Sequence, residues 1–411
     1  MGELEIFDRD NVWEGGNAKE ITFIVTKDCQ LACKYCYLVG KNTKEKMSWD
    51  IAKKTIDYIL DNEFDENFNK RSVVWDFIGG EPFLEIDLID KITDYIKIEL
   101  FKRNHHWFNS YRFSFATNGI NYHTAKVQNY IMKNHKHLSI GITIDGTELL
   151  HDLNRVYKET GKGSYKDVVK NIPLWLSQFP DGATKVTICS ENILYIKESV
   201  LHLFDLGIHD VNINCVFEKV WKEGDDCRLE EQLISLADAM IDNDLYKNYR
   251  CSFFWEHMGK PMDCKLQNQN WCGAGRMLSI DAAGNFYPCT RFAQYSLRDK
   301  KAWIVGNVHE GLDKNKLRPF LTLDRCTQST QECIDCEVAE GCAWCQGENY
   351  DAADTPTAFQ RSTAICKMHK ARVRANNYYW NKLYRKLELE GIAKEDAVKH
   401  VRKESSNIIK C

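Results

Sequence analysis

The chain alternates between short apolar runs and longer stretches in which apolar residues recur at helical spacing. The short runs are rich in Val, Ile, Phe and Tyr, and most end in a turn or polar residue, which predicts strands. These predicted strands cover residues 21–26, 73–78, 111–116, 138–144, 185–189 and 211–217. The helical spacing between them predicts helices over residues 48–60, 84–101, 123–133, 166–177 and 194–206.

Six strand–helix repeats of this kind indicate an α/β fold with a parallel sheet and helical crossovers. A complete barrel needs eight such units, so we expect an open, partial (β/α)6 barrel that resembles part of a TIM barrel. Ser48 is placed as the N-cap of the first helix, because helix-spaced Ile51, Ile56 and Ile59 follow it.

The pattern changes after the sixth predicted strand. A helix is predicted over residues 229–246, the periodicity then fades, and cysteines occur in pairs. We therefore expect a lead over residues 1–20, a barrel over 21–225, a helical bridge over 226–262, a loop-rich domain over 263–368 and a basic helical tail over 369–411. A loop-rich region of this length needs staples, which metal clusters can supply.

Composition narrows the class of protein. Hydrophobic residues make up 44% and charged residues 28% of the 411 positions, which is typical of a soluble globular chain. A net charge of −4 gives no case for nucleic-acid binding. No apolar run approaches the roughly 18 residues of a membrane span, and the acidic, polar N-terminus is unlike a secretory signal. We expect a cytoplasmic protein that binds neither nucleic acid nor membrane.

Cysteine is unusually frequent, with 17 residues in the chain. The odd count and the lack of a signal peptide count against a disulfide framework. Scattered core thiols would explain Cys189, Cys215, Cys227 and Cys251, which stand alone, but not the dense C-terminal group. Metal or iron–sulfur ligation in a reducing cytosol accounts better for that group.

Cys29, Cys33 and Cys36 lie in one loop directly after the first predicted strand. Three thiolates this close can hold three irons of a four-iron cubane and leave the fourth iron open to a ligand. This CxxxCxxC spacing, with aromatic Tyr35 before the last cysteine, resembles the cluster motif of the radical S-adenosylmethionine (SAM) enzymes. The resemblance implies a 4Fe–4S cluster, SAM, a 5′-deoxyadenosyl radical and a flavodoxin or ferredoxin-type electron donor.

Further candidate residues follow the predicted strand ends, where the chemistry of a parallel barrel gathers. A motif like Gly-Gly-Glu-Pro contacts the methionine group of SAM in the radical enzymes, and glycine lets backbone approach a ligand closely. Arg155 and Thr143 are similar in spacing to a cofactor-binding pair of the sulfatase-maturating branch, and a guanidinium suits a carboxylate. The resemblance thus implies SAM contacts from Tyr35, Gly80, Glu81, Asn118, Thr143, Asp145, Arg155, Ser190 and Val216.

The C-terminal cysteines, together with Gly284, which four residues separate from Cys289, resemble the SPASM extension of peptide-modifying radical enzymes. The resemblance implies two auxiliary 4Fe–4S clusters, three clusters in all. One would be held by Cys264, Cys272, Cys289 and Cys345, the other by Cys333, Cys336, Cys342 and Cys366. Only Ala343 and Trp344 separate Cys342 from Cys345, where the family has three residues. Without Cys264, the first of these clusters would have an open iron for a substrate thiolate.

Several alternatives remain open at this point. CxxC pairs also suit two zinc sites, and Cys326 and Cys411 are expected to be spare thiols. The basic residues between Lys370 and Lys386 form either a site for an acidic leader peptide or a solvated helical face.

Sulfatase-maturating enzymes are similar over most of the chain, but they have an Asp base directly after the cysteine that matches Cys289. Here that position is Thr290. The missing base argues against that activity, and the chain looks most like the maturases of Cys-rich repeat peptides. This resemblance implies an enzyme that forms Cys thioether crosslinks in a ribosomally made precursor peptide. The alternatives are a sulfatase-maturating, formylglycine-forming enzyme, another peptide-oxidising radical enzyme, and a zinc-binding interaction module. No residue is assigned as catalytic.

Overall fold

The structure is a computed structural model that describes residues 12–13, 16–264 and 272–403. Its strands are β1 (Ala18–Thr26), β2 (Ser72–Gly79), β3 (Tyr111–Thr117), β4 (Leu138–Ile142), β5 (Ala183–Ile188), β6 (Asp210–Cys215), β7 (Arg250–Cys251), β8 (Leu278–Ile280), β9 (Asn285–Tyr287), β10 (Gly306–Asn307) and β11 (Gly311–Leu312). Its α-helices are α1 (Trp49–Asp61), α2 (Ile86–Lys102), α3 (Ala125–Asn134), α4 (Glu148–Asn154), α5 (Tyr165–Val169), α6 (Ile172–Gln178), α7 (Ile196–Asp205), α8 (Asp225–Asp242), α9 (Lys314–Thr322), α10 (Arg325–Gln328), α11 (Gln331–Ile334), α12 (Gln346–Ala352) and α13 (Cys366–Leu389). None of the described helices has the length and apolar character needed to cross a bilayer.

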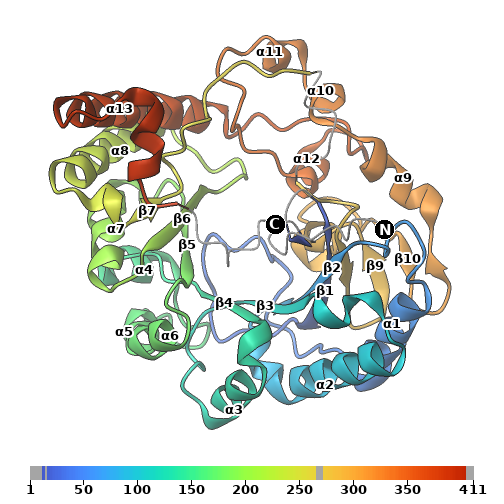
Figure 1. Cartoon of the computed structure of the whole chain (residues 1–411). Helices are drawn as coiled ribbons and strands as arrows, with labels where there is room; N and C mark the ends of the chain where they lie inside the picture. Colours follow the sequence, from blue (N-terminus) through green and yellow to red (C-terminus); the bar gives the residue numbers. More distant parts are fainter. Residues whose placement is uncertain (1–11, 14–15, 265–271, 404–411) are drawn as a thin grey trace, which may run out of the picture.

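The barrel wall consists of two parallel groups of strands inside a ring of helices (Figure 1). Strands β1 to β4 pair in sequence order, and β5 pairs with β6, to which β7 adds. Thr184 connects the groups: its Oγ1 donates to the Ile142 carbonyl at 2.8 Å and accepts from the Ile144 N–H at 3.1 Å. The predicted partial barrel of six strands is confirmed.

The predicted helices are present except that one of them is split, and the short helices α4 and α9 to α12 were not predicted. Ser48 caps α1 as predicted, since its Oγ accepts from the Ile51 N–H at 3.2 Å. The single helix predicted over residues 166–177 is wrong, because α5 ends at Val169 and α6 begins at Ile172. Pro173 explains the break, since it has no N–H to donate and its ring excludes the carbonyl of the preceding turn.

Strand alternation divides the wall into two faces. Phe23, Phe77 and Phe113 are buried in the core that the strands share with the surrounding helices. The alternate positions point to the barrel interior, because successive strand residues face opposite sides. Interior positions include Asp76 and Ser114, which are half-buried, and Ala116, which is exposed. The interior face thus carries polar Asp76 and Ser114 beside apolar Ile24 and Ile78.

The C-terminal half shares the sheet of the barrel. Strand β8 runs parallel to β1, with Ile21 opposite Leu278 and Phe23 opposite Ile280. Strands β9 to β11 continue antiparallel, which gives the order β11-β10-β9-β8-β1-β2-β3-β4. Gly284 has a φ of +81° between β8 and β9, a conformation that favours glycine. The sequence predicted only loops here, and the domain boundary at residue 263 stays a prediction.

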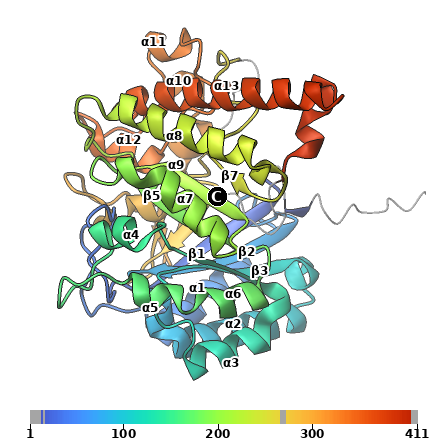
Figure 2. The same ribbon diagram turned by 90° about the vertical axis from the view of Figure 1, so that its left-hand side faces the viewer.

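The basic C-terminal helix α13 lies alongside α8 (Figure 2). Arg374 pairs with Glu230 at 2.6 Å, and Lys382 pairs with Asp238 at 2.7 Å. Lys386 pairs at 2.8 Å with an acidic residue just beyond α8. Much of the positive charge considered for leader binding therefore faces acidic side chains of the same chain, in partly exposed pairs that add little to stability.

Candidate active site

The loop after β1 packs tightly against the turn after β2. The Gly80 N–H donates to the Thr26 carbonyl and the Glu81 N–H donates to the Asp28 carbonyl, both at 2.9 Å. A methyl group on Gly80 would lie 2.2 Å from the Asp28 carbonyl oxygen. Glycine is needed here because two backbone segments touch. The sequence had suggested that this glycine makes room for a ligand.

The three loop cysteines lie at this junction. Cys29 is buried, while Cys33 and Cys36 are half-buried. The Cys36 N–H donates to the Cys33 carbonyl at 3.1 Å, which forms a turn between two of the sulfurs. Burial, with the Glu81 charge nearby, raises the pKa of Cys29 to about 11. Burial also raises the pKa of Cys33, although Arg155 opposes it. Thiolates at these positions therefore need a compensating cation such as a metal centre.

A buried network connects this loop to the ends of β4 and α4. The Tyr35 hydroxyl donates to the Asp145 carboxylate, and Arg155 Nη1 donates to the Tyr35 oxygen at 3.2 Å. Burial raises the pKa of Asp145, and the Arg155 guanidinium counteracts this rise. Arg155 Nε is buried without a hydrogen-bond partner. An unpartnered buried guanidinium N–H is suited to a carboxylate ligand.

Glu81 holds the end of β3. Its carboxylate accepts from Thr117 Oγ1 at 2.6 Å and from the Asn118 N–H at 2.7 Å. The Asn118 side-chain amide then donates to Gln30 Oε1 at 3.1 Å and lies 3.9 Å from Cys29 Sγ. Spacing along the chain does not reveal Thr117 and Gln30 as partners, because these contacts join residues of three different loops.

The other predicted SAM contacts also lie at the strand ends. The Thr143 N–H donates to the Thr117 carbonyl, and the Val216 N–H donates to the Ile188 carbonyl, both at 2.9 Å. Ser190 is half-buried just beyond β5. The fold thus places the predicted contacts at one end of the barrel, with Arg155 reaching it from the end of α4.

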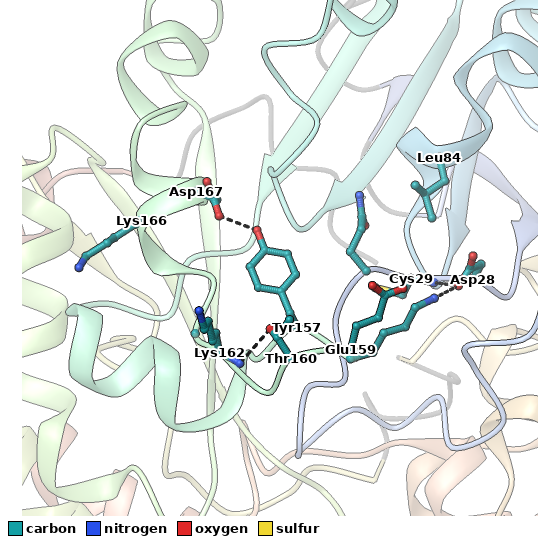
Figure 3. Close-up of a pocket in the computed structure, with 12 residues that line it drawn as sticks. Asp28, Cys29, Leu84, Tyr157, Glu159, Thr160, Lys162, Lys166 and Asp167 are labelled. Atoms are coloured by element: carbon teal, nitrogen blue, oxygen red, sulfur yellow. Dashed lines mark hydrogen bonds and ion pairs between the residues drawn. The ribbon is translucent and has the colours of Figure 1, made fainter.

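A cavity of about 720 Å³ opens beside the cysteine loop (Figure 3). Cys29 and Leu84 line it together with the segment from Tyr157 to Gly163. The Lys158 N–H joins this segment to the cysteine loop by donating to the Gln30 carbonyl at 2.9 Å. None of the nine predicted SAM contacts lines this cavity.

The C-terminal cysteines form two groups. Cys272, Cys289 and Cys345 lie together: burial and Cys345 raise the pKa of Cys272 to about 12, and burial and Cys272 raise that of Cys289. The second group consists of Cys333, Cys336, Cys342 and Cys366, where burial and the neighbouring thiols raise the pKa of Cys342 and of Cys366. The structure thus divides these cysteines into the same two groups that the sequence predicted, except for Cys264.

Cys264 is bonded to Cys326 in a disulfide across 62 residues of sequence. The prediction of Cys264 as a fourth cluster ligand is therefore wrong in this structure, and so is that of Cys326 as a spare thiol. The physical reason is that the chain brings α10, which contains Cys326, to within 5.9 Å of Cys264 between their Cα atoms. The other expected spare thiol, Cys411, lies outside the described residues.

A partly buried ion cluster lies between the cysteine loop and the first C-terminal group. Arg291 Nη1 is 2.6 Å from the Glu218 carboxylate and 3.7 Å from that of Glu348. The same guanidinium stacks on the Tyr37 ring at 4.1 Å. Arg298 also pairs with Glu348, at 2.7 Å. Only folding reveals this cluster, since its members are far apart in sequence.

The spacing of the cysteines bears on the zinc alternative. A tetrahedral zinc–thiolate site has Zn–S distances of about 2.3 Å, which places its sulfurs about 3.8 Å apart. Across the described ranges, only Glu63, His105 and His106 form a group whose ligand atoms all lie within 4.8 Å of one another. No three of the described cysteine sulfurs therefore meet this limit.

Residues 23–212, which contain the cysteine loop and most of the strand-end network, match the family model of the Radical SAM superfamily. This match covers just under half of the 411 positions and shows a likeness to that superfamily over the barrel. The likeness counts against a zinc-binding interaction module as the overall description.

The chain is also similar to known proteins over regions beyond residues 23–212. An uncharacterized protein of Methanocaldococcus jannaschii is 28% identical over 307 residues, 73% of this chain and 91% of its own. A serine-type anaerobic sulfatase-maturating enzyme of Bacteroides thetaiotaomicron is 23% identical over 350 residues, 76% of this chain and 78% of its own. Among solved structures, native anSMEcpe with bound AdoMet and Kp18Cys peptide has a TM-score of 0.64 at 17% identity, covering 89% of this chain and 99% of that one. This structural likeness shows the same fold.

Proposed function

We propose that this protein is a radical SAM enzyme that forms Cys thioether crosslinks in a ribosomally made precursor peptide. The observation that carries the proposal is the junction of the loop cysteines with the Tyr35–Asp145–Arg155 network, at the end of the barrel where the predicted SAM contacts gather. The unpartnered Arg155 Nε supports a carboxylate ligand such as that of SAM at this place.

Each part of the junction has a role in this proposal. Cys29, Cys33 and Cys36 hold a 4Fe–4S cluster that, when bound, supplies the electron for cleaving SAM to a 5′-deoxyadenosyl radical. Arg155 binds the carboxylate of SAM, and Tyr35 and Asp145 hold the guanidinium in place. The electron donor is a flavodoxin or ferredoxin-type protein.

The remaining SAM contacts shape the same site. Glu81 orients Asn118, and Val216 packs beside the adenine. Gly80, Thr143 and Ser190 present backbone and hydroxyl groups at neighbouring strand ends, where a polar ligand can be bound.

The C-terminal cysteine groups suit two auxiliary clusters. Cys333, Cys336, Cys342 and Cys366 offer four ligands to one of them. Cys272, Cys289 and Cys345 offer three to the other, because Cys264 is in a disulfide. A cluster with three protein ligands has a free position, which suits a substrate thiolate and therefore supports sulfur–carbon bond formation over other peptide oxidations.

The peptide substrate is supported by two similar proteins, one a sulfatase-maturating enzyme and the other crystallised with a peptide. The same similarity favours a second candidate, sulfatase maturation. Against it stands Thr290, whose hydroxyl lies 3.2 Å from the Ser279 hydroxyl and offers no carboxylate after Cys289. Thioether formation remains our first proposal for this reason.

The test uses the full chain, purified and reconstituted with iron and sulfide under anaerobic conditions. Dithionite and SAM should yield 5′-deoxyadenosine, and a Cys29→Ala, Cys33→Ala, Cys36→Ala variant should yield none. A Cys-containing peptide encoded beside this chain should lose two hydrogens per crosslink, and tandem mass spectrometry should place a sulfur–carbon bond. Formylglycine in a sulfatase peptide, with no crosslink in the other, would select the second candidate. Undiminished peptide modification by the triple variant would refute both.

A further inference from the structure

His151 is a fully buried residue of α4 whose two ring nitrogens both have hydrogen-bond partners. The Asp145 N–H donates to Nδ1 at 3.3 Å, and Nε2 lies 3.0 Å from Ser164 Oγ. Because Nδ1 accepts, the single proton of a neutral ring is on Nε2, which therefore donates to the Ser164 hydroxyl. That hydroxyl donates onward to the Arg155 carbonyl at 2.8 Å. These bonds form a relay that runs in one direction, from the Asp145 main chain through the histidine and the serine to the Arg155 main chain.

The relay joins the main chains of the two residues whose side chains meet in the candidate site. On the side-chain path, Tyr35 connects the Asp145 carboxylate to the Arg155 guanidinium. On the main-chain path, the relay through His151 connects the same two residues. The Arg155 N–H adds a further bond, since it donates to the His151 carbonyl at 2.9 Å. The two paths close a ring of hydrogen bonds, which holds the carboxylate and the guanidinium at a fixed separation.

The relay requires a neutral imidazole. Burial and the nearby Arg155 charge lower the pKa of His151 well below its usual range, so the ring is uncharged at neutral pH. A neutral ring offers one acceptor and one donor, whereas a protonated ring offers two donors and has no acceptor for the Asp145 N–H. An apolar side chain in its place would leave that buried N–H without this bond, which is unfavourable. The Asp145 main chain is then no longer held against Arg155.

We propose that His151 is a positioning residue, which fixes the place where Arg155 presents its guanidinium to the carboxylate of SAM. This inference rests on the proposed function, in which Arg155 binds that carboxylate. His151 is fully buried, so it acts through its neighbours rather than by touching the ligand. A guanidinium presents its N–H groups in a fixed planar fork, so a displaced or rotated Arg155 loses bonds that a flexible cation would keep. Loss of His151 should therefore weaken SAM binding even though the binding arginine is still present.

The test measures SAM affinity by calorimetry on the reconstituted full chain without reductant, where SAM binds and no radical forms. His151→Leu removes both ring nitrogens, and His151→Gln keeps one acceptor and one donor on a flexible side chain. We expect the affinity to fall about tenfold in His151→Leu, as for a weakened bond to a charged group, and His151→Gln to regain part of the loss. His105→Leu is the matched control. His105 is also buried and also accepts from a backbone N–H, at 3.1 Å, but it precedes β3 at the opposite end of the strands, so SAM affinity should not change.

A double variant distinguishes positioning from a general loss of structure. Arg155→Gln removes the donor itself, so adding His151→Leu to it should weaken SAM binding no further. Two results overturn the inference: an unchanged affinity in His151→Leu, or losses that add in the double variant. Thermal melting and iron per chain check that each variant folds. If His151→Leu does not fold, Ser164→Ala interrupts the relay by removing one hydroxyl, and an unchanged affinity in that variant counts against the relay. Failure of the proposed function is a separate result, in which Arg155→Gln alone leaves the SAM affinity unchanged.

Discussion

Replacing Gly80 by alanine should disrupt the proposed radical SAM centre without unfolding the barrel. The added methyl group would lie 2.2 Å from the Asp28 carbonyl oxygen, 2.5 Å from its carbonyl carbon and 2.9 Å from Cys29 Cβ. These are backbone atoms and the first side-chain carbon of a predicted cluster ligand. No side-chain rotation can relieve the contact, so one of the two loops has to move.

The size of the movement follows from these distances. An ordinary contact needs about 1 Å more than the 2.2 Å available. Overpacking of this kind costs about 1–3 kcal/mol, which a chain of this size tolerates. A displacement of about 1 Å at a catalytic centre, however, can lower the rate about 100-fold. The shift also strains the hydrogen bonds that Gly80 and Glu81 donate to Thr26 and Asp28.

The assay needs no knowledge of the peptide. Anaerobically reconstituted protein is incubated with dithionite and SAM, and 5′-deoxyadenosine is quantified together with iron per chain. Gly141→Ala is the matched control, because its methyl group would find the Ala183 carbonyl oxygen at an ordinary 3.4 Å. We expect a loss of about 100-fold for Gly80→Ala and little change for Gly141→Ala. Full activity and full iron content in Gly80→Ala would show that the two loops are not packed as described.

Three further predictions follow from other parts of the molecule. Arg155→Gln should weaken SAM binding about tenfold or more in calorimetry, because a charged donor to the carboxylate is lost, and unchanged affinity would remove Arg155 from the site. The Cys345→Ala variant should contain about four irons fewer per chain than the natural protein. Adding Cys272→Ala should remove no more iron, whereas adding Cys333→Ala should roughly double the loss. Equal losses in both double variants would contradict the division into two groups. Burial, His106 and Arg103 lower the pKa of His105 to about 4. The unfolded chain therefore binds more protons than the folded chain between about pH 6.5 and 4, and the free energy of unfolding should fall on acidification. His105→Asn should flatten this slope in urea titrations at pH 7 and pH 5, and an identical slope would refute the assignment.

Local features of the chain were predictable because they depend on neighbours in sequence. The alternation of apolar residues located the six barrel strands, and Ser48 marked the start of α1, since capping involves only the next few residues. The failure at Pro173 was also local and could have been avoided, because a proline at that position breaks the helical pattern.

Long-range contacts were the features that the sequence could not supply. Strand β8 is only three residues long and gains its place by pairing with β1, more than 250 residues earlier. The approach of Cys264 to Cys326 and the pairing of Arg291 with Glu218 depend likewise on how distant segments pack. Spacing identified which cysteines are candidate ligands, but it could not tell that Cys264 has another partner.

The sequence by itself determined the repeat of strands and helices, the CxxxCxxC loop and the polar residues that follow each strand, because these are patterns of spacing along one chain. Only the tertiary structure decided that Gly80 serves a backbone contact, that Arg155 has a nitrogen without a partner, and that Arg291 pairs with Glu218. The physical reason is that clashes, unpaired donors and uncompensated charges exist only between groups that folding brings together.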